Sequence, residues 1–415
     1  MYGSSESTIG PFHISNKRSK LVCCMVQEYE EALREHEQLF GQEGRSFVAP
    51  ARVNLIGEHT DYTGGFVMPM AIGFHTSAAI SARNDEQAVI YSANYEEKVV
   101  LNLATLDRYP LGHWSDYPTG VLWSLLQEGV EIGGVNINLV GDVPLGAGLS
   151  SSASVEVATA MALLNHANVQ LPLEKIANLC RRAENEFVGA KSGIMDQFVV
   201  AGAVANRAML LDCRSLKYEL LPLPDEVKVV ICNSMVKHAV ATGEYGNRRD
   251  EVEAGQAALR RRFPRVELLR DATLQDLDAC REDMSEESFA RCRHIITENI
   301  RVLRAREALL QRDLVQFGRL MVDAHASMRD DFAASCNEVD ALVAIATRQD
   351  GCLGARITGG GFGGCTVNLV AVDHVERFVT SVGREYEHST GILADCYVCA
   401  PSDGALAMTA RESVR

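Results

Sequence analysis

Three segments rich in glycine or in polar residues constrain this fold most, because each lies beside sequence that can form a core. They span residues 52–65, 144–154 and 358–365. A linker is not expected directly before the apolar run 366–372, whereas backbone that packs closely against a ligand or another loop needs glycine there. For 358–365 a purely structural tight turn remains an alternative. We expect these backbones to be anchored in the core.

The apolar pattern between these segments predicts a mixed α+β protein. Strands are expected at 74–82, 88–93, 99–103, 134–140, 227–232, 366–372 and 392–398, and helices at 25–40, 152–166 and 173–187, with charged helical sequence over 245–348. A chain of 415 residues is too long for one small core. We expect an N-terminal unit over 25–205, a C-terminal unit over 206–415 and a disordered extension over 1–24.

Charge and composition exclude several classes of protein. A formal charge of −15 disfavours nonspecific binding to nucleic acid or to an anionic membrane. The apolar run 21–26 is shorter than a signal peptide requires, and no stretch reaches the length of a membrane span. The twelve cysteines are scattered without zinc-site spacing, which favours reduced thiols. We expect a cytoplasmic protein that binds neither nucleic acid nor membrane.

The first segment concentrates ionisable groups. Arg52, Glu58, His59 and Asp61 fall within ten residues that also contain Val53, Leu55 and Ile56. Most such clusters are solvated loops, and that remains one interpretation. Carboxylates and an imidazole held beside apolar walls also suit a ligand with many hydroxyl groups, because each hydroxyl both donates and accepts hydrogen bonds. The segment therefore predicts a polar binding site.

The second segment follows a predicted strand and precedes a helix. Its glycines permit close approach to a ligand, its serines can cap the helix, and a helix N-terminus attracts anions. This combination is typical of phosphate binding, although the Gly-Lys-Ser/Thr ending of a Walker A loop is absent. A capped helix after a flexible turn is the alternative interpretation.

Two acids stand out further along the chain. Glu184 falls on the apolar stripe formed by Ile176, Cys180 and Phe187, so its charge needs compensation. Pairing with an arginine is the common solution, and Mg²⁺ is the alternative beside a phosphate site. Asp196 lies among apolar neighbours, where it could act as a general base, a helix cap or a turn residue.

The motifs resemble a known family. RVNLIGEHTDY at 52–62, PLGAGLSSSAS at 144–154 and TGGGFGG at 358–364 resemble the three motifs of the GHMP kinases. The first, together with GIMDQ at 193–197, resembles galactokinases within that family. The resemblance implies a two-lobed fold, with a ribosomal protein S5-like N-terminal lobe and a GHMP C-terminal lobe. It also implies transfer of the γ-phosphoryl group of ATP to the anomeric hydroxyl of α-D-galactose.

The resemblance also implies roles for individual residues. Asp196 would be the catalytic base and Arg52 would stabilise charge near the reacting oxygen. The sugar would contact Glu58, His59, Asp61, Gly193 and Tyr245. The phosphates would be wrapped by Gly146, Ala147, Gly148, Leu149, Ser150, Ser151 and Ser152. Trp114 and Tyr117 would wall the adenine site, and Ser152 and Glu184 would hold Mg²⁺.

Some expectations remain open within this resemblance. A kinase for N-acetylgalactosamine or L-arabinose is one alternative, and a non-catalytic sensor of galactose and ATP is another. Ser152 followed by Ala153 favours catalysis, because the sensors lack that pair. The family commonly has glycine where this chain has Ala51, and we expect an ordinary backbone angle there. We expect a monomer that binds the sugar and ATP.

Overall fold

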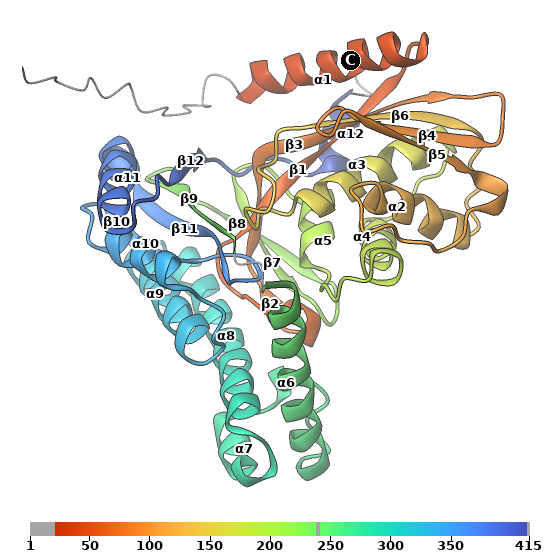
Figure 1. The fold of residues 1–415 in the computed structure, drawn as a ribbon. Helices are drawn as coiled ribbons and strands as arrows, with labels where there is room; N and C mark the ends of the chain where they lie inside the picture. Colours follow the sequence, from red (N-terminus) through yellow and green to blue (C-terminus); the bar gives the residue numbers. More distant parts are fainter. Residues whose placement is uncertain (1–20, 238–240, 413–415) are drawn as a thin grey trace, which may run out of the picture.

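The computed structural model describes residues 21–237 and 241–412 and has two lobes of mixed helix and sheet (Figure 1). The described strands form a five-stranded sheet in the order β1-β3-β6-β4-β5, a four-stranded sheet in the order β10-β11-β9-β12, and a three-stranded sheet in the order β2-β7-β8. The predicted α+β class is confirmed, and each predicted strand overlaps a strand of the structure.

The five-stranded sheet belongs to the N-terminal half and is covered by helices on both faces (Figure 1). Its strands are β1 (Arg45–Asn54), β3 (Pro69–Ala82), β4 (Gln87–Ser92), β5 (Glu97–Asn102) and β6 (Val135–Gly141). The helices on one face are α2 (Asp116–Gln127), α3 (Ser151–His166), α4 (Leu173–Arg182) and α5 (Met195–Gly202), and α1 (Leu21–Phe40) lies on the other.

The alternation predicted for β6 explains why both faces are covered. Ile137 and Leu139 pack into the core under α3, whereas Asn138 points the other way and donates to the carbonyl of Ala32 on α1, at 3.2 Å. The helix α1 begins at Leu21, so it includes the last four residues of the extension expected over 1–24. Residues 1–20 lie outside the described part of the chain.

The C-terminal half packs helices against the four-stranded sheet of β9 (Val227–Lys237), β10 (Cys352–Ile357), β11 (Gly363–Ala371) and β12 (Asp395–Cys399). The helices that pack on this sheet are α9 (Leu314–Asp330), α10 (Asn337–Thr347) and α11 (Val375–Thr390). The helices α6 (Ala241–Arg262) and α7 (Leu274–Ala279) pack on α8 (Glu286–Leu310), which in turn packs on α9. Strand β9 is buried on both faces, as its continuous apolar sequence predicts, because Ile231 and Val230 belong to different core clusters.

The two halves share a core rather than touching at their surfaces. One apolar cluster joins Val53 of β1 to Ile231 of β9 and Met321 of α9. The last helix, α12 (Ala405–Glu412), returns to pack on β1 and α5. We retain the division near residue 205 as a sequence-based proposal. No helix within residues 21–237 and 241–412 has both the length and the apolar character to cross a bilayer.

The third sheet links the halves and consists of β2 (Phe66–Val67), β7 (Arg207–Asp212) and β8 (Tyr218–Pro222). It packs beside α8, whose Asn299 accepts a hydrogen bond from the amide of Phe66 at 2.8 Å. This contact anchors the polar segment 52–65, which runs between β1 and β2, against the C-terminal half.

Candidate active site

The three glycine-rich or polar segments meet at one place. The amide of Arg52 donates to the carbonyl of Leu149 at 3.2 Å, which joins the first segment to the second. The third segment packs on the second so closely that a Cβ on Gly359 would lie 3.3 Å from the carbonyl oxygen of Gly148. The backbone at 358–365 therefore packs against another loop, which is one of the two close-packing alternatives that the sequence left open.

Arg52 and Asp196 form the charged centre of this junction. The Arg52 side chain donates to both carboxylate oxygens of Asp196, at 2.7 and 2.6 Å, and to the carbonyl of Gly148 at 2.6 Å. Arg52 is only 5% exposed, whereas the side chain of Asp196 is 25% exposed, so the arginine end of this fork is shielded and the carboxylate end is accessible. Ala51 lies inside β1 and outside the positive-φ residues, which confirms the ordinary backbone angle expected there.

The start of α3 differs from the sequence-based expectation. Ser150 precedes the helix with a φ of 59°, and its hydroxyl donates to Asp196 instead of capping the helix. The expectation that the serines of this segment cap the helix is therefore not met at its N-cap position. Because no side chain caps α3 at this position, its first amides are available to an anion.

A small cavity, here called the charged cavity, surrounds this centre. It has a volume of about 110 Å³. It is lined by Arg52, Glu58, His59, Asp61, Ser192, Gly193, Met195, Asp196, Tyr245, Gly359 and Gly360. The structure thus brings together every residue predicted to act in catalysis or to bind the sugar, although Tyr245 comes from α6 and the others from distant elements.

Glu58 lies in the charged cavity and also holds the third segment in place. One carboxylate oxygen, Oε1, accepts from the amide of Gly359 at 2.9 Å and lies 2.9 Å from the guanidinium of Arg356. Arg356 is completely buried at the end of β10 and was not singled out from the sequence. A lone arginine between an apolar strand and a glycine run was the signal available to find it.

His59 is held as a neutral ring. It has a φ of 61° and stacks on Phe332 with ring centroids 4.1 Å apart. Burial lowers the pKa of His59 to about 3. Its Nδ1 lies 3.2 Å from the hydroxyl of Tyr62, and its Nε2 has no hydrogen-bond partner among the described residues. A buried polar atom without a partner beside a cavity suits a ligand hydroxyl.

Asp61 and Gly193 form the tightest contact of the charged cavity. A Cβ on Gly193 would lie 1.8 Å from Oδ2 of Asp61, so only glycine allows this approach. Burial, aided by the nearby negative charge of Asp196, raises the pKa of Asp61 to about 7. The Tyr245 ring completes this wall, where a Cβ on Gly360 would come within 3.4 Å of it.

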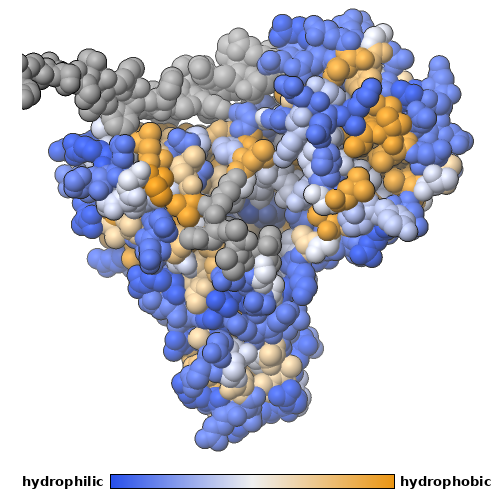
Figure 2. Space-filling view, viewed as in Figure 1, coloured by the Kyte–Doolittle hydropathy of each residue, from blue (hydrophilic) through white to orange (hydrophobic). Residues whose placement is uncertain are grey.

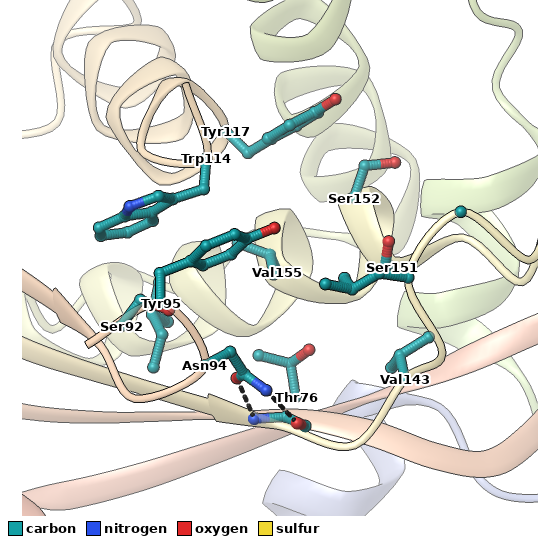
Figure 3. Close-up of a pocket in the computed structure, with 14 residues that line it drawn as sticks. Thr76, Ser92, Asn94, Tyr95, Trp114, Tyr117, Val143, Ser151, Ser152 and Val155 are labelled. Atoms are coloured by element: carbon teal, nitrogen blue, oxygen red, sulfur yellow. Dashed lines mark hydrogen bonds between the residues drawn. The ribbon is translucent and has the colours of Figure 1, made fainter. Parts of the chain in front are cut away.

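A second and larger cavity, here called the aromatic cavity, lies at the N-terminus of α3 (Figure 3). It has a volume of about 250 Å³. Its lining residues are Thr76, Ser92, Asn94, Tyr95, Trp114, Tyr117, Leu139, Gly141, Val143, Leu145, Gly146, Ser151, Ser152 and Val155. Asn94 and Gly141 exchange two hydrogen bonds, at 2.7 and 3.0 Å, that fix one edge.

The aromatic cavity contains only part of the predicted nucleotide site. Trp114, Tyr117, Gly146, Ser151 and Ser152 line it as predicted. The loop predicted to wrap the phosphates also contains four residues that contact other parts of the protein. Ala147 and Leu149 belong to a core cluster, and Gly148 and Ser150 contact Arg52 and Asp196.

Tyr95 is a lining residue that sequence reasoning missed. Its ring lies nearly parallel to Trp114, with an interplanar angle of 9° and centroids 5.8 Å apart (Figure 3). Tyr95, Tyr109 and Leu111 have exposed side chains, and Figure 2 shows apolar surface over β4, β5 and α2. The rim of this cavity is therefore apolar, unlike the charged cavity.

Glu184 lies where α4 continues into a π-helical turn over residues 183–188. It is buried and accepts hydrogen bonds from Ser192 at 2.5 Å and from Gln197 at 2.8 Å. Burial raises the pKa of Glu184, and hydrogen bonds from Ser192, Gln197 and Ser152 oppose the rise. Within the described part of the chain we find no ion pair to this carboxylate, so the arginine alternative lacks support.

The oxygen atoms around Glu184 suit Mg²⁺ as ligands. Glu184 accepts hydrogen bonds from Ser152, which lines the aromatic cavity, and from Ser192, which lines the charged cavity, so it is linked to both sites. Oxygen ligands are what this cation prefers, and it commonly takes one or two protein oxygens together with phosphates and water. No cluster of three His, Cys, Asp or Glu side chains suited to a metal occurs in the described ranges.

Glu156 and Gln197 are further buried groups that sequence reasoning missed. Glu156 lies on α3 with no exposed surface, and its Oε2 accepts from Nε2 of Gln197 at 2.9 Å. Its Oε1 has no hydrogen-bond partner among the described residues. Burial, with the nearby charge of Glu184, raises the pKa of Glu156 well above its usual value. An acid alone within the small and apolar residues 153–164 was the signal that could have identified it.

Comparison with protein families identifies three matching regions. The galactokinase galactose-binding signature matches residues 34–82. The N-terminal domain of GHMP kinases matches residues 116–203, and the C-terminal domain matches residues 305–387. These ranges contain most of the residues that line the two cavities.

Individual relatives match over most of the chain. The galactokinase of Roseiflexus sp. (strain RS-1) is 42% identical over 86% of this chain and 91% of its own, and that of Chloroflexus aurantiacus is 41% identical over 91% and 97%. The structure of Lactococcus lactis galactokinase complexed with galactose has a TM-score of 0.87, with 34% identity over 90% of this chain and 98% of its own. Mevalonate kinase of Methanococcus jannaschii shares the fold, with a TM-score of 0.62 and 20% identity. The chain belongs to the galactokinase family of GHMP kinases.

Proposed function

We propose that this protein transfers the γ-phosphoryl group of ATP to the anomeric hydroxyl of α-D-galactose, giving galactose 1-phosphate and ADP. The contact between Asp196 and Ser150 carries this proposal. It places a carboxylate of the charged cavity beside the uncapped N-terminus of α3, where phosphate oxygens are stabilised. A sugar hydroxyl and a phosphoryl group can therefore approach each other at this point.

Asp196 and Arg52 supply the charges at the reacting atoms in this proposal. Asp196 accepts the proton of the anomeric hydroxyl or orients that hydroxyl for attack. Arg52 holds the carboxylate in position through two hydrogen bonds and offers positive charge to the phosphoryl oxygens. Positioning and charge neutralisation account for most of the catalysis of phosphoryl transfer, so a rigid pair of this kind suits the reaction.

The remaining residues of the charged cavity recognise the sugar. Glu58, Asp61 and the neutral ring of His59 offer acceptors and donors to its hydroxyl groups, while Tyr245 and Gly193 shape the wall. The solved relative whose structure is complexed with galactose supports this choice of sugar. The curated relatives, which are galactokinases, favour this sugar and an active enzyme over a kinase for N-acetylgalactosamine or L-arabinose or a non-catalytic sensor.

The aromatic cavity binds the nucleotide in this proposal. The first amides of α3 and the backbone around Gly146 cradle the phosphates, and Trp114, Tyr117 and Tyr95 enclose the adenine. Ser152 and Glu184 would hold Mg²⁺, which neutralises phosphate charge when bound. We also propose a monomer located in the cytoplasm, as the sequence predicts.

The test is ADP release from Mg-ATP with a panel of sugars, with the product identified by ³¹P NMR. We expect turnover with galactose and 2-deoxygalactose, little with glucose, and a phosphate on the anomeric oxygen. Preference for N-acetylgalactosamine or L-arabinose would replace the substrate. Binding of galactose and ATP without ADP release would identify a sensor instead of an enzyme.

A further inference from the structure

We propose that Glu156 is a positioning residue for Glu184 and acts through the side-chain amide of Gln197. The inference rests on the proposed function, because it assumes that Glu184 helps to hold Mg²⁺. It adds a residue that touches neither cavity and that none of the three motifs at 52–62, 144–154 and 358–364 assigns to a role in the reaction.

The geometry is a bridge between two buried carboxylates. Nε2 of Gln197 lies 2.9 Å from Oε2 of Glu156 and 2.8 Å from Oε2 of Glu184. The three residues come from α3, α5 and the π-helical turn after α4, so the bridge joins three elements. All three residues are buried, which protects the bridge from competition by water.

The chemistry of an amide makes this bridge directional. An amide nitrogen offers two hydrogens, and here each is directed to one carboxylate oxygen. Without an acceptor at Glu156, the Gln197 amide could rotate and turn its own oxygen toward Glu184. That arrangement would remove a donor from Glu184 and add repulsion between lone pairs. Glu156 therefore keeps the amide oriented so that its nitrogen faces Glu184.

The position of the bridge explains why it matters for the reaction. Gln197 follows Asp196 directly on α5, so the side chain that orients Glu184 adjoins the proposed base. Ser152, the other proposed metal ligand, lies four residues before Glu156 and hence on the same side of α3. The bridge thus joins the elements that carry both proposed metal ligands and the proposed base.

The bridge also gives a reason why α3 contains a buried acid that lowers the stability of the fold. A buried acid with one unpartnered oxygen destabilises a helix whose other buried residues there are small or apolar. A residue that is costly for folding and adjoins a proposed metal site fits the pattern of groups that orient metal ligands. The proposal requires only an acceptor atom at this position, not a negative charge.

The experiment compares two substitutions at Glu156 with a control on the same helix. Glu156→Leu removes the acceptor, and Glu156→Gln keeps an acceptor without the charge. Thr159→Val is the matched control, since Thr159 is also completely buried on α3 and its hydroxyl has no hydrogen-bond partner among the described residues. Binding of Mn²⁺ in the presence of a non-hydrolysable ATP analogue is measured by EPR, beside KM values, kcat and thermal unfolding.

We expect Glu156→Leu to weaken Mn²⁺ binding by about 10- to 100-fold, the usual effect of losing a group that orients a metal ligand. The KM for galactose should not change, and Glu156→Gln and Thr159→Val should bind Mn²⁺ like the wild type. If Glu156→Leu binds Mn²⁺ normally, or if Thr159→Val loses as much affinity, the inference is wrong. Equal loss in Glu156→Gln and Glu156→Leu would show that charge, not the acceptor, matters.

Two further outcomes separate this inference from the proposed function. If Glu184→Gln binds Mn²⁺ normally, the metal assignment and the inference both fail, although galactose phosphorylation could still stand. If the wild type releases no ADP with any sugar but shows the expected Mn²⁺ pattern, the proposed function fails and the bridge remains. A loss of thermal stability alone in Glu156→Leu would make Glu156 a structural residue.

Discussion

The charged cavity and the aromatic cavity lie on either side of the start of α3 but are built in different ways. The charged cavity is held by side chains that bind one another, such as Arg52 with Asp196 and Glu58 with Arg356. The aromatic cavity is formed by stacked rings, small residues and backbone, as in the pairing of Asn94 with Gly141.

This difference predicts how each cavity responds to substitution. A change in the charged cavity leaves a buried charge without its partner, which costs several kcal/mol in typical cases. A change at the rim of the aromatic cavity removes contact area that is already partly exposed. Substitutions in the charged cavity should therefore affect turnover or galactose binding, whereas substitutions in the aromatic cavity should mainly affect the affinity for ATP.

The largest effect is expected for Asp196→Asn. The amide cannot accept the proton of the sugar hydroxyl and no longer pairs with Arg52, so kcat should fall by about 10²- to 10⁴-fold. Ser150→Ala is a milder companion, because it removes a single hydrogen bond to the same carboxylate. Single-turnover ADP release measures both variants, and near-normal turnover by Asp196→Asn would contradict the role of Asp196.

Arg52→Lys should have the next largest effect. Lysine keeps the charge but cannot donate to both oxygens of Asp196 and to the carbonyl of Gly148 at once. We expect kcat to fall by about 10²-fold, at the lower end of the effect of losing one charge-stabilising donor. Steady-state kinetics with galactose and ATP varied separately test this, and an effect confined to either KM would show that Arg52 only shapes a binding site.

The way each cavity is built also determines which of its residues can be predicted from the sequence. Arg52, Glu58 and Asp61 were found because several ionisable groups in a short segment are visible in the sequence. Arg356, the partner of Glu58, was missed because the pairing depends on two segments about three hundred residues apart. Tyr95 was missed for a similar reason, since only the fold brings the turn after β4 beside the segment that contains Trp114.

The fold itself was predictable where the apolar period was strong. Strand β6 and helix α3 lie within one residue of their predicted bounds, because alternation and small-residue helical sequence are local signals. Strand β1 was not predicted, because its second half carries the polar chemistry of the site and reads as a loop. The expected capping of the N-terminus of α3 by a serine hydroxyl is not found at Ser150, because this hydroxyl donates to Asp196 instead.

Gly193→Ala should weaken galactose binding without a comparable effect on ATP. A Cβ at this position would lie 1.8 Å from a carboxylate oxygen of Asp61, so the wall of the charged cavity must shift. Displacement of that wall should raise the KM for galactose by about tenfold, equivalent to about 1.4 kcal/mol. Gly133→Ala is the control, since no atom lies within 4 Å of its added Cβ. Equal changes in both variants would argue against this wall.

Asp61 should make stability depend on pH. Burial and the charge of Asp196 raise the pKa of Asp61 from 3.8 to about 7, so between these values the folded protein holds a proton that the unfolded chain releases. Its contribution to stability is complete below pH 4 and is lost as pH rises through 7. The Asp61→Asn variant has no carboxyl group to titrate here, so it does not lose this stability. As pH rises, the free energy of unfolding of the variant relative to the wild type should increase by at most about 1.4 kcal/mol per pH unit. Urea unfolding at pH 5, 6 and 7 measures the trend, and a constant difference would show that the carboxyl does not titrate in this range.

Tyr95→Ala should have the smallest effect and sharpens the contrast between the cavities. The ring stacks on Trp114, but Tyr95 is 46% exposed. The free energy of its contact with adenine should therefore lie at the low end of the range for base–aromatic stacking. That corresponds to about 1 kcal/mol, or roughly a fivefold rise in the KM for ATP. Tyr95→Phe retains the ring and should match the wild type, and kcat and the KM for galactose should stay unchanged in both. If Tyr95→Ala instead lowers kcat as strongly as Arg52→Lys, the aromatic cavity positions the reacting phosphoryl group, and the separation between a site for affinity and a site for turnover does not hold.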